Sequence, residues 1–305
     1  MSDPLERTFR PPHPTDLLQT LRVLSRGARD KTIRIGKTPG EGVWRATITP
    51  QGPCTQHLFQ RGDEITVRAW GNGAQWALDH APVLIGGNDD HTDFVAHHDF
   101  LDRAHRLNPG LRFTCTQAVW EVMLPVILEQ KVTGTEARAS YAALQRALST
   151  PAPTAPGGPA LLLPPAPAMV AGTPSHVFHA ANVERKRSDS IRRAAGYAHR
   201  LEEASTMSMV DAYARLRALP GLGEWTANEV GVVALGDTDA VSVGDYHLKN
   251  LVSWALAGEA RGTDERMVEL LEPYRPHRAR VVRLISASGI RQPKFGPRLT
   301  IQQRW

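Results

Sequence analysis

Two glycines in "LPGLGEWTANEV" (residues 219–230) have the spacing of a loop that binds phosphate groups. Gly221 and Gly223 look like the start of a loop that binds a dinucleotide, but such a loop must follow a β-strand. The preceding stretch instead has apolar side chains three residues apart, which is helical spacing, and that helix must end at Pro220. Those side chains are Val210, Tyr213, Leu216 and Leu219. The segment therefore predicts a helix, a tight hairpin and a second helix from Trp225.

A hairpin with two glycines has two interpretations. Glycine permits a positive φ and leaves N–H groups uncovered, and N–H groups at a helix N-terminus bind anions. The hairpin can thus hold a phosphate of a nucleic-acid backbone without reading its sequence. The alternative is a plain turn that closes on glycine between two packed helices.

Three aspartates follow in "GDTDAVSVGDYHLK" (residues 236–249). Asp245 comes after Gly244 and before a helical stripe, which is the position of an N-cap. A helix N-terminus keeps a carboxylate ionised, and such a carboxylate can stabilise the sugar cation formed when a glycosidic bond breaks. The alternative is a cap with no further role. Asp237 and Asp239 lie in turn-type sequence and are interpreted as solvated turn residues.

The elements that position these residues fall into two parts. The first hundred residues alternate apolar and polar side chains between Gly, Pro and Asp turns, which predicts an antiparallel sheet with a helix or two on one face. The expected helix is 13–27, capped by Thr15 or Asp16, and the expected strands are 31–35, 42–50, 56–60 and 64–71. After residue 100 the period becomes helical, over 115–148 and from 175 nearly to the end. The prediction is an α+β chain with a mixed domain at 1–100 and an all-helical domain at 101–305.

Two segments have biased composition. Residues 149–174 are rich in Pro and Ala, and we expect them to wrap a surface before the next helix. Residues 87–105 are rich in acids and histidines but lack a metal-ligand spacing, so a solvated connector is favoured over a metal site.

Charge and composition restrict the function classes. The net charge is +5 and the pI is near 9.5, which favours an acidic partner such as nucleic acid. Cys54 and Cys115 are the only cysteines, so four-cysteine metal or iron–sulfur sites within the chain are excluded. No stretch has the ~18 apolar residues of a membrane span. We expect a cytoplasmic, nucleoid-associated monomer without a metal site.

"LPGLGEWTANEV" followed by "VGDYHLK" resembles the helix–hairpin–helix DNA glycosylase superfamily, and within it the bacterial 3-methyladenine DNA glycosylase II type. The segments "FRPPHPTDLLQTL", "PGLRFTCTQAVWEVMLPVILEQKV" and "NVERKRSDSIRRAAGYA" are similar as well, so nearly the whole chain is covered. The hairpin and the aspartate are specific, whereas the N-terminal likeness is looser.

The resemblance implies a role for each matching residue. Asp245 would be the catalytic carboxylate, and the 219–227 hairpin would bind double-stranded DNA with a damaged base, often with a monovalent cation. The implied DNA-binding residues are Gly221, Leu222, Gly223 and Thr226 of the hairpin, with Gln130 and Lys131 in the turn that fills the space left by an extruded base. Lys131 is unusual there, because an apolar wedge is common. The implied base pocket contains Trp225 and Tyr246, with Glu229 and His277 where further aromatic residues align.

The resulting hypothesis is a monofunctional glycosylase for alkylated purines in base excision repair. The alternatives are a DNA-damage-binding protein without catalysis and a glycosylase–lyase for oxidised bases. A lyase needs a lysine where this chain has Trp225, although Lys249 keeps the alternative open. If Glu229 is charged and faces the pocket, we expect cationic 3-methyladenine and 7-methylguanine to leave faster than neutral hypoxanthine and ethenoadenine. The alternative is that Glu229 and His277 are solvated or paired.

Overall fold

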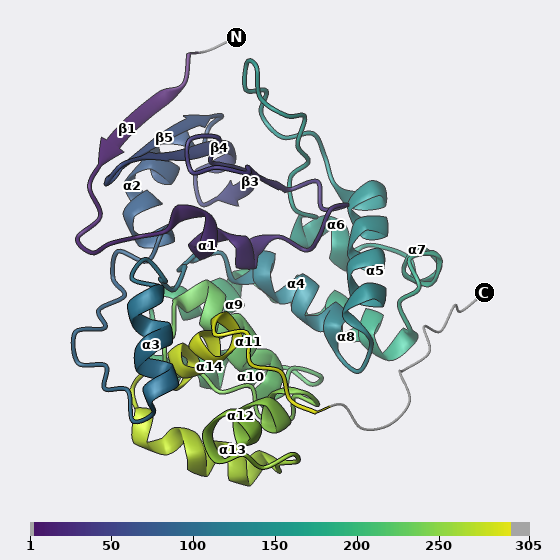
Figure 1. Ribbon diagram of the computed structural model, residues 1–305. Helices are drawn as coiled ribbons and strands as arrows, with labels where there is room; N and C mark the ends of the chain where they lie inside the picture. The colour runs from purple at the N-terminus through teal and green to yellow at the C-terminus, as the bar shows by residue number, and fades with distance from the viewer. Residues whose placement is uncertain (1–2, 294–305) are drawn as a thin grey trace.

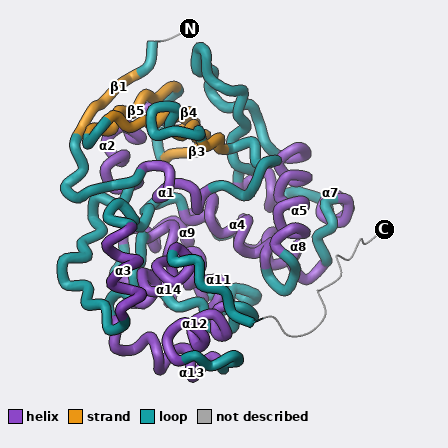
Figure 2. The backbone as a smooth tube through the Cα atoms, in the orientation of Figure 1, coloured by secondary structure: helices purple, strands orange, loops and turns teal. Residues whose placement is uncertain are grey.

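The chain folds into a five-stranded antiparallel sheet near its N-terminus and a larger set of helices (Figure 1). The computed structural model describes residues 3–293. Figure 2 shows the strands gathered at one end of the molecule and the helices filling the rest. The predicted α+β class is confirmed, whereas the domain limits at 1–100 and 101–305 remain a prediction. None of the described helices is both long and apolar enough to cross a bilayer.

The sheet has the strand order β1-β5-β4-β3-β2, and every neighbouring pair is antiparallel. The strands are β1 (Leu5–Phe9), β2 (Ile33–Ile35), β3 (Val43–Thr49), β4 (Gly52–Arg61) and β5 (Glu64–Trp70). The four predicted strands are confirmed. Strand β1 was missed because its side chains are almost all exposed, so it lacks the alternation that marks a half-buried strand.

Two helices cover one face of the sheet and form a core with it. They are α1 (Leu17–Leu21), which continues as the 3-10 turn η1 (Arg22–Leu24), and α2 (Ala74–Leu84). The Asp16 carboxylate caps α1 by accepting from Gln19 N at 2.8 Å, as predicted, but the helix is shorter than 13–27. Buried apolar side chains fill the interface, among them Leu17, Leu21, Val43, Leu58, Ile65, Val67, Ala77 and Ala81.

Helices make up most of the remaining described chain. They are α3 (Asp99–Leu107), α4 (Val119–Glu129), α5 (Gly134–Leu148), α6 (Pro167–Ala171), α7 (Ser175–Ala180), α8 (Arg185–Gly196), α9 (Ala198–Glu202), η2 (Glu203–Thr206), α10 (Met209–Arg217), α11 (Glu224–Val230), the π-turn η3 (Gly231–Leu235), α12 (Leu248–Ala257), α13 (Asp264–Leu271), η4 (Glu272–Tyr274) and α14 (Arg278–Ala287). The helical stretch predicted at 115–148 is two helices. The break comes where Thr133 starts α5 with a reciprocal capping box to Glu136.

The Pro-rich segment wraps the sheet, as expected. Leu162 N donates to Lys31 O at 2.9 Å, and Thr55 Oγ1 donates to Pro153 O at 2.7 Å. Leu161 and Leu163 bury their side chains against Ala46 of β3. A segment that comes late in the sequence thus covers strands formed early.

The segment at 87–105 is solvated over much of its length, as expected, but it is also anchored to the helices at both of its ends. Asp89 is buried in an ion pair with Arg280 of α14, and Phe113 N also donates to it at 2.9 Å. The end of the segment forms the first turns of α3, which buries Leu101 and packs against α14. Within residues 3–293 no group of three or more His, Cys, Asp or Glu side chains is arranged to hold a metal ion.

Candidate functional site

The hairpin between α10 and α11 depends on the first glycine. Gly221 has a φ of +93°, which other residues adopt only with strain. A Cβ atom placed there would clash with Ser190 Oγ of α8. Gly221 is therefore required both by the backbone conformation and by the close approach of α8.

The second glycine has a different role. Gly223 stands at the N-cap of α11 with an ordinary φ of −88°, and a Cβ atom there would meet nothing within 4 Å. Its lack of a side chain leaves the start of α11 uncovered, which suits an anion at the free N–H groups. Between the two glycines, Leu222 points inward and is buried. Its side chain anchors the loop, and its N–H group donates to Leu219 O at 3.1 Å.

Gln130 ties the turn after α4 to the hairpin. Its Nε2 donates to Gly221 O at 3.0 Å and to Thr226 Oγ1 at 2.9 Å. Arg193 of α8 donates to Pro220 O at 2.7 Å from the other side. Thr226 is buried and its hydroxyl accepts from Gln130, so the implied direct DNA contact of Thr226 is corrected to a supporting role. Gln130 also positions the hairpin.

Lys131 comes next in the chain and is presented outward. It has a φ of +55° and an exposed side chain. A left-handed residue that is not glycine is uncommon and reflects a turn fixed by its surroundings. Its ammonium group therefore lies at the tip of a turn that Gln130 fastens to the hairpin.

The N-cap residue of α12 is His247, so the predicted N-cap position of Asp245 is corrected by two residues. The Asp245 carboxylate nevertheless bonds the N–H groups at the start of this helix. Its Oδ1 atom accepts from His247 N at 2.7 Å and from Leu248 N at 2.8 Å. Gly244, with a φ of +91°, makes the bend before it. Among the described residues no donor reaches Oδ2, so one carboxylate oxygen is held by the helix and the other is available to a ligand.

Two residues near Asp245 in the sequence, Tyr246 and Lys249, differ in exposure and in partners. Tyr246 is 70% exposed and its ring meets the His247 ring edge-on, with centroids 5.0 Å apart. It presents a free aromatic face beside Asp245 rather than a wall of a closed pocket. Lys249 is paired with Asp264, Nζ to Oδ2, at 3.1 Å.

Helix α11 brings Trp225 and Glu229 to the same side, because residues four apart lie on one helical face. Ser242 donates a hydrogen bond from Oγ to the Glu229 carboxyl, and Asn228 Nδ2 donates to Val241 O at 2.5 Å. These two bonds join α11 to the segment that leads to Asp245. Burial raises the pKa of Glu229, and the nearby carboxylates of Glu129 and Asp245 raise it further against the effect of Ser242.

His277 does not line the site, which corrects the implied pocket role. It is buried before α14, where its Nε2 bonds Asp93 Oδ1 at 2.7 Å and its Nδ1 accepts from Arg280 Nε at 3.4 Å. The Phe94 ring packs edge-on against it. Both ring nitrogens are thus used to fasten the 87–105 segment to α14.

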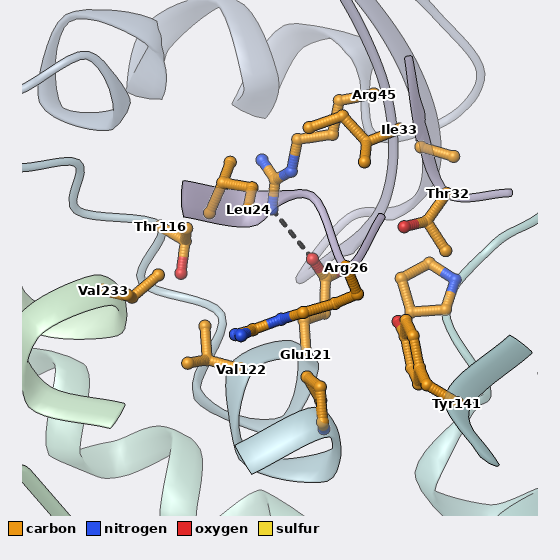
Figure 3. Close-up of a pocket in the computed structure, with 13 residues that line it drawn as sticks. Leu24, Arg26, Thr32, Ile33, Arg45, Thr116, Glu121, Val122, Tyr141 and Val233 are labelled. Atoms are coloured by element: carbon orange, nitrogen blue, oxygen red, sulfur yellow. Dashed lines mark hydrogen bonds and ion pairs between the residues drawn. The ribbon is translucent and has the colours of Figure 1, made fainter. Parts of the chain in front are cut away.

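A small cavity lies between the sheet and α4, and neither the hairpin nor Asp245 lines it (Figure 3). It has a volume of about 40 Å³ and contains the ion pair of Arg45 with Glu121 at 2.8 Å. This volume suits a few water molecules and is far too small for a nucleobase. The cavity belongs to the packing between the two parts of the chain.

Sequence reasoning missed Ser242, Asn228 and Arg193 as parts of the site. Ser242 and Asn228 act through bonds that span 13 residues, and Arg193 acts across 27. No local sequence motif marks such partners. Only the short stretch of chain between α11 and Asp245 indicated that α11 contacts the segment leading to Asp245.

No protein-family model matches the chain, and no curated protein matches it in sequence. Solved structures do match. A 3-methyladenine DNA glycosylase from Archaeoglobus fulgidus has a TM-score of 0.74 at 15% identity over 92% of this chain and 96% of that one. A Clostridium acetobutylicum 8-oxoguanine glycosylase/lyase in complex with DNA has 0.71 at 10% identity over 94% and 97%. A Schizosaccharomyces pombe 3-methyladenine DNA glycosylase with abasic DNA has 0.53 at 17% identity over 66% and 96%. At these identities the comparison shows a shared fold.

Proposed function

Because the chain has the fold of the helix–hairpin–helix DNA glycosylases, we propose that it is a DNA glycosylase whose catalytic carboxylate is Asp245. The observation that carries this proposal is the state of that side chain. One oxygen is fixed by two backbone N–H groups and the other is open, beside the α11 hairpin that suits a phosphate. A non-catalytic DNA-binding protein would need the hairpin but not an open carboxylate next to it.

The proposed reaction begins with extrusion of the damaged base from the duplex, which costs a few kcal/mol. The N–H groups at Gly221 and Gly223 bind the backbone phosphate, and Lys131 enters the vacated space. Arg193 already supplies positive charge at the Pro220 carbonyl. The proposal includes a monovalent cation at the 219–227 hairpin, and no step depends on it.

Bond cleavage then relies on Asp245. As the bond from the sugar to the base breaks, the carboxylate stabilises the oxocarbenium-like sugar and orients a water molecule towards it. The products are a free base and an abasic site. An alkylated purine that carries a positive charge leaves readily, so we propose alkylated purines as substrates.

We propose further that the enzyme is monofunctional. The structural neighbours include a glycosylase/lyase, so the fold does not choose between the two reactions. A lyase needs a deprotonated amine as nucleophile. Trp225 occupies the hairpin position implied for that amine, and Lys249 is held in an ion pair with Asp264.

The test is release of free 7-methylguanine from methylated duplex DNA by wild type and by Asp245→Asn. We expect the substitution to lower the single-turnover rate on the order of 10²–10³-fold, because it removes charge that acts on the transition state. Binding to duplex DNA with an abasic-site analogue should change by less than about threefold, because the hairpin is intact.

Asp79→Asn is the matched control, since Asp79 is exposed on α2, away from the hairpin and Asp245. Release by Asp245→Asn at the wild-type rate would remove Asp245 from the mechanism. Tight binding without any release by wild type would favour the non-catalytic alternative.

A further inference from the structure

Glu229 is a second carboxyl group that the proposed reaction has not yet used. It lies one helical turn after Trp225 on α11 and is bonded to Ser242, which comes three residues before Asp245. Ser242 Oγ donates to its Oε1 atom. Among the described residues no donor or cation is bonded to Oε2, so that oxygen is available to a ligand.

The charged groups around Glu229 come from four elements. Glu129 at the end of α4 and Asp245 before α12 are negative and disfavour a second negative charge. Arg26, after η1, is positive, but it is bonded to Glu129 Oε1 at 3.1 Å. Arg283 of α14 is positive as well, but its guanidinium lies over the Phe113 ring at 3.9 Å and donates to Arg112 O. Both arginines thus have other partners.

Glu229 and Asp245 are therefore two carboxyl groups in opposite environments. Asp245 Oδ1 accepts hydrogen bonds from two backbone N–H groups. Glu229 is half-buried next to two carboxylates, and desolvation and the neighbouring negative charges both raise its pKa. A carboxyl group that favours its proton, close to a second carboxyl group in a polar, hydrogen-bonded setting, is the usual arrangement for a proton donor and an anion that act together.

We propose that Glu229 is the proton donor to the departing base, which extends the substrate range from cationic purines to uncharged ones such as hypoxanthine. This rests on the proposed glycosylase function and deepens it. It also reverses the expectation from the sequence, in which Glu229 is an anion that attracts cationic bases.

The step balances without a further reagent. The bond between C1′ and the base nitrogen breaks with its electron pair on the base, while Glu229 transfers its proton from Oε2 to a ring nitrogen of that base. The base leaves neutral, and Asp245 stabilises the cationic sugar. Water adds at C1′ and releases one proton, which returns through solvent to the Glu229 carboxylate.

The experiment compares hypoxanthine and 7-methylguanine release under single-turnover conditions by wild type and by Glu229→Gln. The expected loss is about a hundredfold for hypoxanthine, typical of a general acid. 7-Methylguanine release should stay within about twofold, because a cationic base needs no proton to leave. In Glu229→Gln the difference between the release rates of 7-methylguanine and hypoxanthine should therefore become larger. If Glu229 acted as an anion that attracts cationic bases, the substitution would make this difference smaller.

The wild-type pH profile gives a second reading that needs no variant. The donor must hold its proton, so hypoxanthine release should fall as pH rises through the raised pKa of Glu229. That fall should be absent in Glu229→Gln. Glu269→Gln on the exposed side of α13 is the matched control and should leave both rates unchanged.

The remaining outcomes also decide the matter. Four results would overturn the proton-donor role and leave the glycosylase proposal standing. Two concern Glu229→Gln: a smaller difference between the two release rates, or equal losses of rate for both bases. Two concern wild type: hypoxanthine release that does not depend on pH, or release of 7-methylguanine without any release of hypoxanthine. If wild type releases neither base, the proposed function itself fails.

Discussion

At the scale of single residues, the three aspartates after the hairpin have different partners. Asp237 accepts from the Tyr213 hydroxyl at 2.6 Å, and Asp239 bonds Arg275 and Arg278 at 3.0 and 2.8 Å. Interpreting these two as solvated turn residues was wrong, because both are tied to neighbouring helices. Asp245 alone of the three bonds only backbone N–H groups in the described chain, which fits a carboxylate kept for a ligand.

The state of Lys249 leads to a prediction about the abasic product. The wild-type protein should leave the DNA strand intact and form no adduct that borohydride traps, because an ammonium group paired with Asp264 is a poor nucleophile. Gel analysis of the product strand, with and without borohydride, measures both results. A trapped complex in wild type that disappears in Lys249→Ala would establish the lyase alternative instead.

At the scale of elements, the site is built from turns that fasten one another. Gln130 links the turn after α4 to the hairpin, Arg193 links the hairpin to α8, and the Glu229–Ser242 bond links α11 to the Asp245 loop. Each bond joins segments that are distant in sequence. The geometry of the site is therefore a property of the packed helices rather than of the motif alone.

The two hairpin glycines give a matched pair of stability predictions. Gly221→Ala should lower the free energy of unfolding by about 2–4 kcal/mol, because the new Cβ meets Ser190 Oγ and φ is positive. Gly223→Ala should change it by less than about 0.5 kcal/mol, since φ is negative and the space is open. Urea unfolding followed by circular dichroism measures both. Similar losses for the two variants would contradict this account of the hairpin.

Local signals in the sequence predicted the local structure of the site. The helical stripe, Pro220 and the glycines predicted the hairpin, and the place of Asp245 before a second stripe predicted that its carboxylate bonds the start of α12, because each depends on residues within one or two turns. The sequence could not predict that Glu229 bonds Ser242 or that His277 bonds Asp93, since those pairs depend on tertiary packing. Strand β1 escaped prediction for a related reason, because an exposed edge strand needs no apolar alternation.

At the scale of the whole molecule, a buried ion pair joins the segment that follows α2 to the last described helix, α14. Arg280 and Asp89 are almost fully buried, and Arg280 also lies over the Phe113 ring at 5.2 Å. Removing one member of such a pair leaves an uncompensated charge, which costs more than the pair itself contributes. This contact fixes α14 against the segment that leaves the sheet.

Asp89→Ala should therefore destabilise the whole protein by about 3–5 kcal/mol. Asp90→Ala is the control, because Asp90 is exposed and bonds only within its own turn, to Thr92 N. Its effect should stay below about 1 kcal/mol. Urea unfolding again gives both values, and a loss below 1 kcal/mol for Asp89→Ala would show that the pair does not hold α14 in place.

The Pro-rich segment has a consequence for how the molecule is completed during synthesis. The face of β3 around Ala46 is covered by Leu161 and Leu163, so the sheet stays partly bare until residues 161–163 have left the ribosome. Until then its apolar side chains face water and offer a surface for association. A fragment cut after residue 100 would carry the same uncovered face permanently. The two parts of the chain are thus poor candidates for separate expression, whatever their boundary in sequence.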